Sequence, residues 1–194
     1  LDLTHFSKAG KFNNAVQSIK FSHSNSIKFG DLNGDGKLQR MVTFGGRSFS
    51  IWDIEKALLI FDSGDDFEQI TAQRYGNKFN QSNNKLKNED RSDNKGPEPE
   101  ALTSAVIAGK TYAFIGLERM GGIMVYDITQ PHNSQFVQYL NNRDITINPK
   151  DNSDSDGDGI KEYSIDAGDL GPEGFKFVSA ENSPTKSPIL IVGN

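Results

Sequence analysis

Apolar residues along this chain occur in short segments rich in Val, Ile, Phe and Tyr, separated by Gly, Asn, Asp and Ser. This pattern is typical of an all-β protein with frequent turns. The clearest unit covers residues 100–140, where glycine-containing turns join four candidate strands. The strands are expected at 101–108, 111–117, 123–127 and 134–140. Four antiparallel strands within roughly 40 residues match one blade of a β-propeller.

The same rhythm occurs at 26–62, and a third unit begins at 173 and runs to 194. Its strands, and those of the first unit, are expected at 26–29, 41–44, 49–53, 57–61, 173–179 and 188–192. A propeller needs at least four blades of about 40–45 residues, and the 194 residues of this chain, less the two long polar insertions at 76–95 and 141–169, are too few to close such a ring comfortably. We therefore interpret it as a β-propeller fragment of two to three four-stranded blades, part of a single larger all-β domain.

One short helix and two long polar loops interrupt the strands. Asp65 is expected to cap the helix, with Glu68 completing a capping box and the helix running to about Gln73. The segments 76–95 and 141–169 are too polar for strands and too long for simple turns, so they are expected to be functional loops or locally disordered segments.

Composition narrows the choice of partners. The 21 Lys and Arg residues against 26 Asp and Glu residues give a net charge of −5, which does not attract nucleic acid or anionic lipid. No apolar run approaches the ~18 residues of a transmembrane segment. Cysteine is absent, so neither a disulfide nor a thiolate metal site can form. The sequence contains no complete phosphate-binding loop, no paired zinc histidines and no Gly-x-Ser-x-Gly motif.

The segment DLNGDGK at 31–37 carries oxygen ligands at alternate positions. Asp31, Asn33 and Asp35 resemble the first half of a calcium loop. An EF-hand would require a bidentate Glu at the twelfth position, where this chain has Val42. A calcium site and an Asn-Gly/Asp-Gly turn are both consistent with the segment.

A second acidic segment, DNSDSDGDGIKE at 151–162, has the same alternation. Asp154, Asp156 and Asp158 precede a glycine, and their mutual repulsion would be relieved by a divalent ion. The alternative is a solvated acidic loop. We favour Ca²⁺ as the cofactor, and such ions would stabilise an extracellular fold without disulfides.

Two related segments, GPEPE at 96–100 and GPEG at 171–174, each lead into the first strand of an expected blade. Because the innermost strands of a propeller line its channel, Glu98, Glu100 and Glu173 are expected to converge as metal ligands. The alternative is that proline only rigidifies the two strand entries while the acids face water.

Basic residues accompany the first of these segments. Arg91 and Lys95 precede it, and Arg119 follows a strand. Arg suits bidentate phosphate recognition and Lys supplies a point charge, so these residues suggest an anionic or phosphorylated small molecule as ligand. Singly, each is equally consistent with pairing to a surface acid.

Several long segments resemble the choice-of-anchor I family of secreted or surface propeller proteins, whose members are often labelled alkaline phosphatases. They are TFGGRSFSIWD at 43–53, DSGD at 62–65, RSDNKGPEPE at 91–100, GLERMGGIMVYD at 116–127 and GDLGPEG at 168–174. The resemblance implies a β-propeller, a secreted, periplasmic or cell-surface location and a metal-associated function. Animal relatives include mesenchyme-specific cell-surface glycoproteins associated with biomineralisation.

Two functions follow from these features. In the first, the protein is an alkaline-phosphatase-like phosphoesterase, in which Glu98, Glu100 and Glu173 hold the metal. Its Arg91, Lys95 and Arg119 stabilise the developing phosphoryl charge. In the second, it is a non-enzymatic, calcium-binding surface propeller for adhesion or for mineral or ligand binding. The exposed sheet edges of a fragment are also expected to favour self-association.

Overall fold

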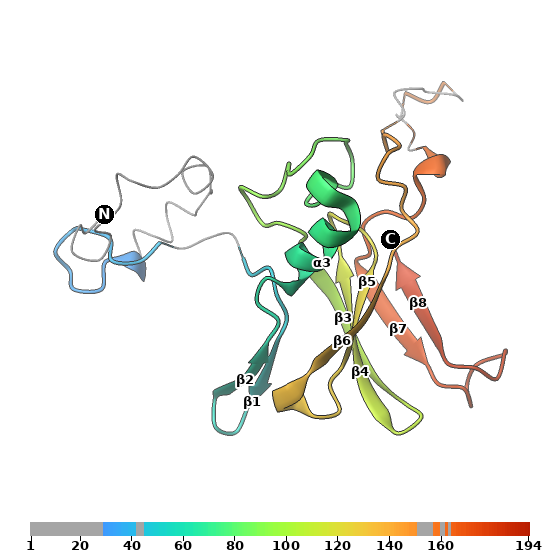
Figure 1. Cartoon of the computed structure of the whole chain (residues 1–194), viewed down its shortest axis with the longest axis horizontal. Helices are drawn as coiled ribbons and strands as arrows, with labels where there is room; N and C mark the ends of the chain where they lie inside the picture. The colour runs from blue at the N-terminus through green and yellow to red at the C-terminus, as the bar shows by residue number, and fades with distance from the viewer. Residues whose placement is uncertain (1–28, 42–44, 151–156, 160–161, 163) are drawn as a thin grey trace.

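The computed structural model describes residues 29–41, 45–150, 157–159, 162 and 164–194. These residues form eight strands in three antiparallel sheets, with the helix α3 at one end of the central sheet (Figure 1). Their bounds are β1 Ser50–Asp53, β2 Leu58–Asp62, β3 Pro99–Ile107, β4 Lys110–Leu117, β5 Ile123–Asp127, β6 Gln135–Leu140, β7 Gly174–Val178 and β8 Ile189–Gly193. The helix α3 spans Asp66–Tyr75, and 3-10 turns span Gly76–Lys78, Pro131–Asn133 and Ile165–Ala167.

The central sheet has the order β3-β4-β5-β6, so four consecutive strands pair with their neighbours in the chain. The four strands expected at residues 101–140 are thereby confirmed. Side chains of β3 alternate between exposed and covered positions, as expected for an antiparallel strand with one covered face. The first turn lies one residue earlier than predicted, at Ala108-Gly109, because both residues have positive φ (49° and 80°). This is the backbone of a type I′ hairpin.

Two hairpins flank the central sheet, β1-β2 on one side and β7-β8 on the other (Figure 1). They confirm the strands predicted near 49–61 and 173–192. The strands expected at 26–29 and 41–44 fall mostly outside the described residues, and neither Phe29 nor Met41 lies in a strand. Among the residues that the structure describes, the three sheets do not close into a ring.

Helix α3 is present as predicted, but its N-terminus differs. The Asp65 side chain makes no capping hydrogen bond, and the expected capping box is wrong. The reason is that the Glu68 carboxylate accepts hydrogen bonds from Arg47 and Asn80 instead, at 2.7 and 2.5 Å. Glu68 therefore joins the helix to the loops beside it.

The core lies between the central sheet, α3 and the β1-β2 hairpin. Tyr126 of β5 is surrounded by aromatic rings, among them Phe49 at a centroid distance of 4.9 Å and Phe67 at 6.1 Å. Its hydroxyl donates to Asp66 at 2.9 Å, which satisfies the polar end of a buried ring. This packing fixes α3, and with it Glu68, against the sheet.

The β7-β8 hairpin packs on the central sheet where β4 carries Gly116. A Cβ at Gly116 would lie 2.8 Å from the Phe175 ring and 3.0 Å from the Ala101 side chain. The absence of a side chain at Gly116 therefore allows Phe175 to seat on the sheet. This contact holds the third sheet beside β3.

Replacing Gly116 with alanine is expected to lower the free energy of unfolding by about 1–3 kcal/mol, the usual cost of overpacking. Gly174→Ala is the matched control, because a Cβ there meets no atom within 4 Å. Urea unfolding of both variants measures the difference. Equal stability of the two variants would contradict the proposed seat for Phe175.

Candidate functional site

The candidate site forms where β3 begins and β4 ends. Because these strands are antiparallel, with Pro99 opposite Leu117, the residues flanking Pro99 lie next to the residue after Leu117. The Glu118 amide donates to the Glu98 carbonyl at 2.8 Å. The carboxylates of Glu98, Glu100 and Glu118 consequently lie within 4.8 Å of one another.

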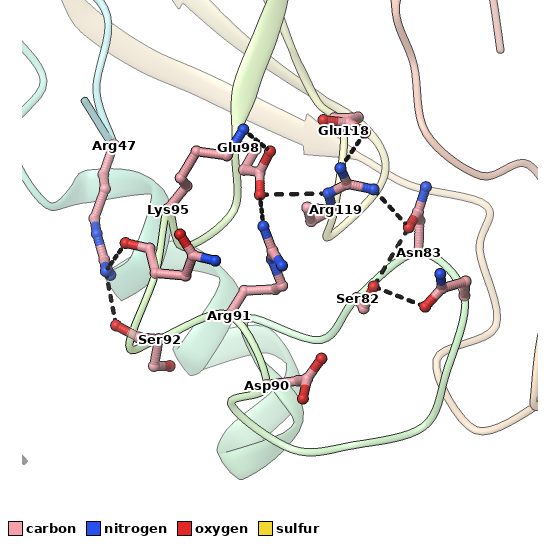
Figure 2. A network of polar contacts seen from close by, with 12 residues as sticks. Arg47, Ser82, Asn83, Asp90, Arg91, Ser92, Lys95, Glu98, Glu118 and Arg119 are labelled. Atoms are coloured by element: carbon pink, nitrogen blue, oxygen red, sulfur yellow. Dashed lines mark hydrogen bonds and ion pairs between the residues drawn. The ribbon is translucent and has the colours of Figure 1, made fainter. Parts of the chain in front are cut away.

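Glu98 is the carboxylate with the most ion-pair contacts in this cluster. Its side chain is buried, and it contacts three cations (Figure 2). Lys95 Nζ lies 2.6 Å from Oε2, Arg119 Nε lies 3.3 Å from Oε1, and Arg91 Nη2 also contacts Oε1. Burial acts to raise the pKa of Glu98, but the hydrogen bonds from Lys95 and Arg91 and the charges of Arg91 and Arg119 outweigh it and lower the pKa. Glu98 is therefore ionised at neutral pH.

The backbone of Glu98 is strained, with φ of 52°. A residue other than glycine adopts this left-handed backbone conformation at a cost of roughly 1 kcal/mol or more. Surrounding contacts must therefore hold the backbone of Glu98 in place. The ion pairs and the Glu118 amide supply that restraint. The strain places the carboxylate among the three cations.

Glu118 and Glu100 form the second part of the cluster. Burial raises the pKa of Glu118 to about 7, helped by a hydrogen bond with Glu100 and by the charges of Glu98 and Glu100, and opposed by Arg119. Arg119 Nη2 lies 2.8 Å from Glu118 Oε1. Near neutral pH the Glu118 carboxyl therefore keeps its proton in part of the molecules.

The charges of the cluster nearly balance. Three carboxylates face three cations, and all three cations contact Glu98. Of these cations only Arg119 also contacts one of the two remaining carboxyls, that of Glu118. Glu100 and Glu118 are therefore the carboxyls of the cluster with the fewest cationic contacts.

A further arginine fixes the loop that carries Glu98. Arg47 donates to the Ser92 carbonyl at 2.7 Å (Figure 2). It also binds Glu68 at 2.7 Å and donates to the Asn94 carbonyl at 2.9 Å. Asn80 donates to Glu68 and to the Ser92 hydroxyl. The loop preceding β3 is thus tied to α3 by partly buried polar contacts. For this segment the sequence predicted either a functional loop or local disorder, and these contacts favour the loop.

The sequence Asn80-Gln81-Ser82 in this loop is a formal N-glycosylation sequon. All three residues are buried, and Asn80 has a left-handed backbone with φ of 52°. An N-linked glycan needs an exposed asparagine, so the folded chain does not present this sequon for glycosylation.

A pocket of about 220 Å³ opens beside the cluster. It is lined by Gly45, Gly46, Lys95, Glu98, Pro99 and Glu100. The glycines leave the pocket open on one side, since a Cβ at either would meet no atom within 4 Å. A small polar ligand or a hydrated ion can therefore reach Glu100 and Lys95 from solvent.

The structure brings five of the predicted site residues together and leaves Glu173 out. Arg91, Lys95, Glu98, Glu100 and Arg119 all lie in the cluster. Glu173 is exposed, and its amide pairs with the Gly193 carbonyl at the start of the β7-β8 hairpin. Its place as third carboxylate is taken by Glu118, which the sequence pattern did not single out as a ligand. Antiparallel pairing of the flanking strands is the signal that identifies it.

The first predicted calcium loop is exposed. Both Asp31 carboxylate oxygens accept backbone hydrogen bonds, from Gly34 and Gly36 at 2.8 Å, and Asp35 accepts one from Lys37 at 2.9 Å. Asn33 accepts from the Asp35 amide at 3.3 Å. These contacts are those of an Asx-stabilised turn. Calcium binding by this loop stays a prediction.

The second predicted calcium loop is only partly described. Asp154 and Asp156 lie outside the described residues, while Asp158 is exposed. Calcium binding here also stays a prediction. In the part of the chain that the structure covers, no helix has the length and apolar character needed to cross a bilayer.

Comparison with known proteins yields two matches. The family model of the choice-of-anchor I domain matches residues 4–131. Gigasin-3a of Magallana gigas is 28% identical over 166 residues, which cover 81% of this chain and 55% of Gigasin-3a. The chain thus spans about half the length of the curated relative that it matches. No solved structure matches it.

Proposed function

The chain belongs to the choice-of-anchor I family, as its sequence resemblance predicted, and on that premise we propose that it is part of an exported β-propeller that binds calcium without hydrolysing a substrate. The observation that carries the proposal is the Glu100–Glu118 pair, two carboxyls that lie within 4.8 Å of each other and of Glu98 and that have one cationic contact between them in the cluster, Arg119 on Glu118.

The propeller part of the proposal is supported by the arrangement of the strands. Four consecutive antiparallel strands, β3 to β6, form one sheet, and a hairpin lies on either side of it. Phe175 packs against the sheet beside β3, as expected between adjoining blades. Export and a cell-surface location are proposed from the family.

The residues of the pair suit a hard divalent cation. Ca²⁺ prefers carboxylate oxygens, and an ion bound between Glu100 and Glu118 would relieve the repulsion between their carboxylates. Glu98 suits this role less well, because three cations already contact its carboxylate. We therefore assign the ion to Glu100 and Glu118. Glu98 instead binds the neighbouring cations Arg91, Lys95 and Arg119.

The same ion pairs weigh against hydrolysis. A phosphoesterase needs cations that can contact a transferred phosphoryl group. Arg91 and Arg119 are held by Glu98, and Arg119 also contacts Glu118 and Asn83. Binding is therefore the function that this geometry supports best.

Phosphoester hydrolysis remains the second candidate because Lys95 lines the pocket beside Glu100. In that case a bound metal would polarise the phosphoryl oxygen, and Lys95 would contact the anionic part of the substrate. Lys95 is the most exposed of the three cations, with 38% of its side chain accessible.

Calcium is expected to stabilise the chain through Glu100. At about 100 times the dissociation constant, a ligand adds roughly 3 kcal/mol to the free energy of unfolding. For a domain of this size that corresponds to a rise in melting temperature of roughly 6–10 °C. Differential scanning calorimetry with calcium and with chelator measures the rise.

The Glu100→Gln variant is expected to lose most of this rise, while Glu55→Gln, a change at an exposed glutamate, keeps it. An equal rise in both variants would place the bound calcium elsewhere, for example at Asp31 or Asp158. A panel of phosphomonoesters and phosphodiesters distinguishes the second candidate, since chelator-sensitive phosphate release that Glu100→Gln abolishes would establish hydrolysis.

A further inference from the structure

Arg143 is a buried arginine that lies beyond the carboxylate cluster. Only 4% of its surface is exposed, and its guanidinium contacts no carboxylate among the described residues. Instead it donates to three backbone carbonyls, those of Ser82 and Arg119 at 2.8 Å and that of Met120 at 3.4 Å. Burial of the charge lowers the pKa of Arg143. Burying a charged guanidinium without a carboxylate partner costs free energy, and hydrogen bonds to the three carbonyls offset part of that cost.

The carbonyls that Arg143 binds belong to the two loops that hold Arg119. One loop carries Ser82 and Asn83, and the Asn83 side chain accepts a hydrogen bond from Arg119 Nη1 at 2.9 Å (Figure 2). The other is the turn after β4, which carries Glu118 and Arg119. A single guanidinium therefore fixes both the backbone of Arg119 and the residue next to its side-chain partner.

Arg143 is itself held rigidly. Its amide donates to the Asn141 side chain at 3.0 Å, and Asn141 in turn donates to the Tyr139 hydroxyl at 2.9 Å. Gly168 packs directly on this segment, since a Cβ at Gly168 would lie 2.4 Å from the Asn142 carbonyl. The segment after β6 therefore presents the guanidinium in one place.

Among the cations that the structure describes, Arg119 is the one that contacts both Glu98 and Glu118. A shift of its guanidinium would change the charge around Glu118 and the space available to an ion. A planar guanidinium can donate to several carbonyls at fixed angles, which a lysine ammonium does not reproduce. Arginine is therefore the residue that this connection requires.

We propose that Arg143 is a positioning residue of the cluster, which holds Arg119 in the arrangement that lets Glu100 and Glu118 bind calcium. The calcium step rests on the function proposed above, whereas the positioning of Arg119 does not.

The test compares Arg143→Met and Arg143→Lys with Arg74→Met. Arg74 is a matched control, because its guanidinium also donates to a backbone carbonyl, that of Tyr139 at 2.7 Å. Calorimetric titration gives the calcium dissociation constant. Carbon-13 signals of the Glu118 carboxyl and nitrogen-15 signals of the Arg119 guanidinium report the arrangement of the cluster without calcium.

Arg143→Met is expected to weaken calcium binding by about tenfold or more, the usual effect of removing an outer contact of a metal site. It is also expected to shift the Glu118 and Arg119 signals. Arg143→Lys should recover part of both effects, and Arg74→Met should alter neither, even if it lowers the melting temperature.

Unchanged Glu118 and Arg119 signals in folded Arg143→Met would overturn the positioning role. Failure of both Arg143 variants to fold would also overturn it, because Arg143 would then be needed for the fold alone. If the unmodified chain binds no calcium at Glu100, the proposed function fails, and the signals measured without calcium still decide whether Arg143 positions Arg119.

Discussion

Glu98→Gln is expected to lower the free energy of unfolding by about 3–5 kcal/mol, the cost of removing one partner from a buried ion pair. The glutamine keeps the size of the side chain but leaves Arg91, Lys95 and Arg119 facing one another without their shared negative charge. The strained backbone at residue 98 would also lose the ion pairs that hold it. No other single carboxylate of the described residues contacts three cations.

Chemical denaturation at pH 7 measures this loss, and Glu89→Gln is the control. Glu89 has the same left-handed φ of 52°, but its side chain is exposed and lies outside the ion-pair cluster around Glu98. The control variant is expected to stay within about 0.5 kcal/mol of the unmodified chain, as surface substitutions usually do. A similar small change in Glu98→Gln would show that the three cations do not depend on Glu98.

The second large effect is a loss of stability with rising pH, caused by Glu118. The pKa of Glu118 is about 7 in the folded chain, above its ordinary value of 4.5. Between these values the folded chain retains a proton that the unfolded chain has released. Its contribution is complete below pH 4.5 and is lost as pH rises to about 7, a loss on the order of 3 kcal/mol.

Glu118→Gln removes the ionisable group and is expected to flatten the dependence of stability on pH between 5 and 8. At pH 8 without calcium, the variant should be more stable than the unmodified chain, because it buries no second negative charge beside Glu100. Denaturation in chelator across this pH range measures both effects. If the variant keeps the same pH profile as the unmodified chain, Glu118 is not the group whose titration changes the stability.

A control variant and the addition of calcium separate the Glu118 effect from other sources of pH dependence. Glu181→Gln, at an exposed glutamate, should keep the original profile. Glu98 has a lowered pKa, so its contribution is lost only as pH falls through that lower value, outside the range of the Glu118 effect. Calcium at pH 8 should restore stability in the unmodified chain and fail to do so in Glu118→Gln.

The sequence predicted the strands well because their signal is local. Alternation of side chains along 101–107 and glycine at 109 define β3 and its turn without reference to the rest of the chain. The shift of that turn by one residue also has a local cause, since Ala108 adopts a positive φ together with Gly109. Family membership, too, rested on continuous segments of sequence and is confirmed.

Helix α3 shows that a local sequence pattern can predict an element without predicting the partners of its side chains. Its presence was predicted, but the expected capping box requires Glu68 to turn back to the helix start. Arg47 and Asn80 bind that carboxylate instead, and both come from other parts of the chain. Glu68, which the local pattern assigned to the helix cap, thus makes tertiary contacts with Arg47 and Asn80 instead.

The sequence by itself determined the all-β class, the central four strands, the family and five of the residues in the charged cluster. Only the tertiary structure decided that Glu118 joins them and that Glu173 does not. The pairing of β3 with β4 brings residues 98 and 118 together, while the entry of β7 leaves Glu173 in solvent. Electrostatic interactions depend on distance and burial, so the partners of each charge become defined only when distant segments of the chain are in place.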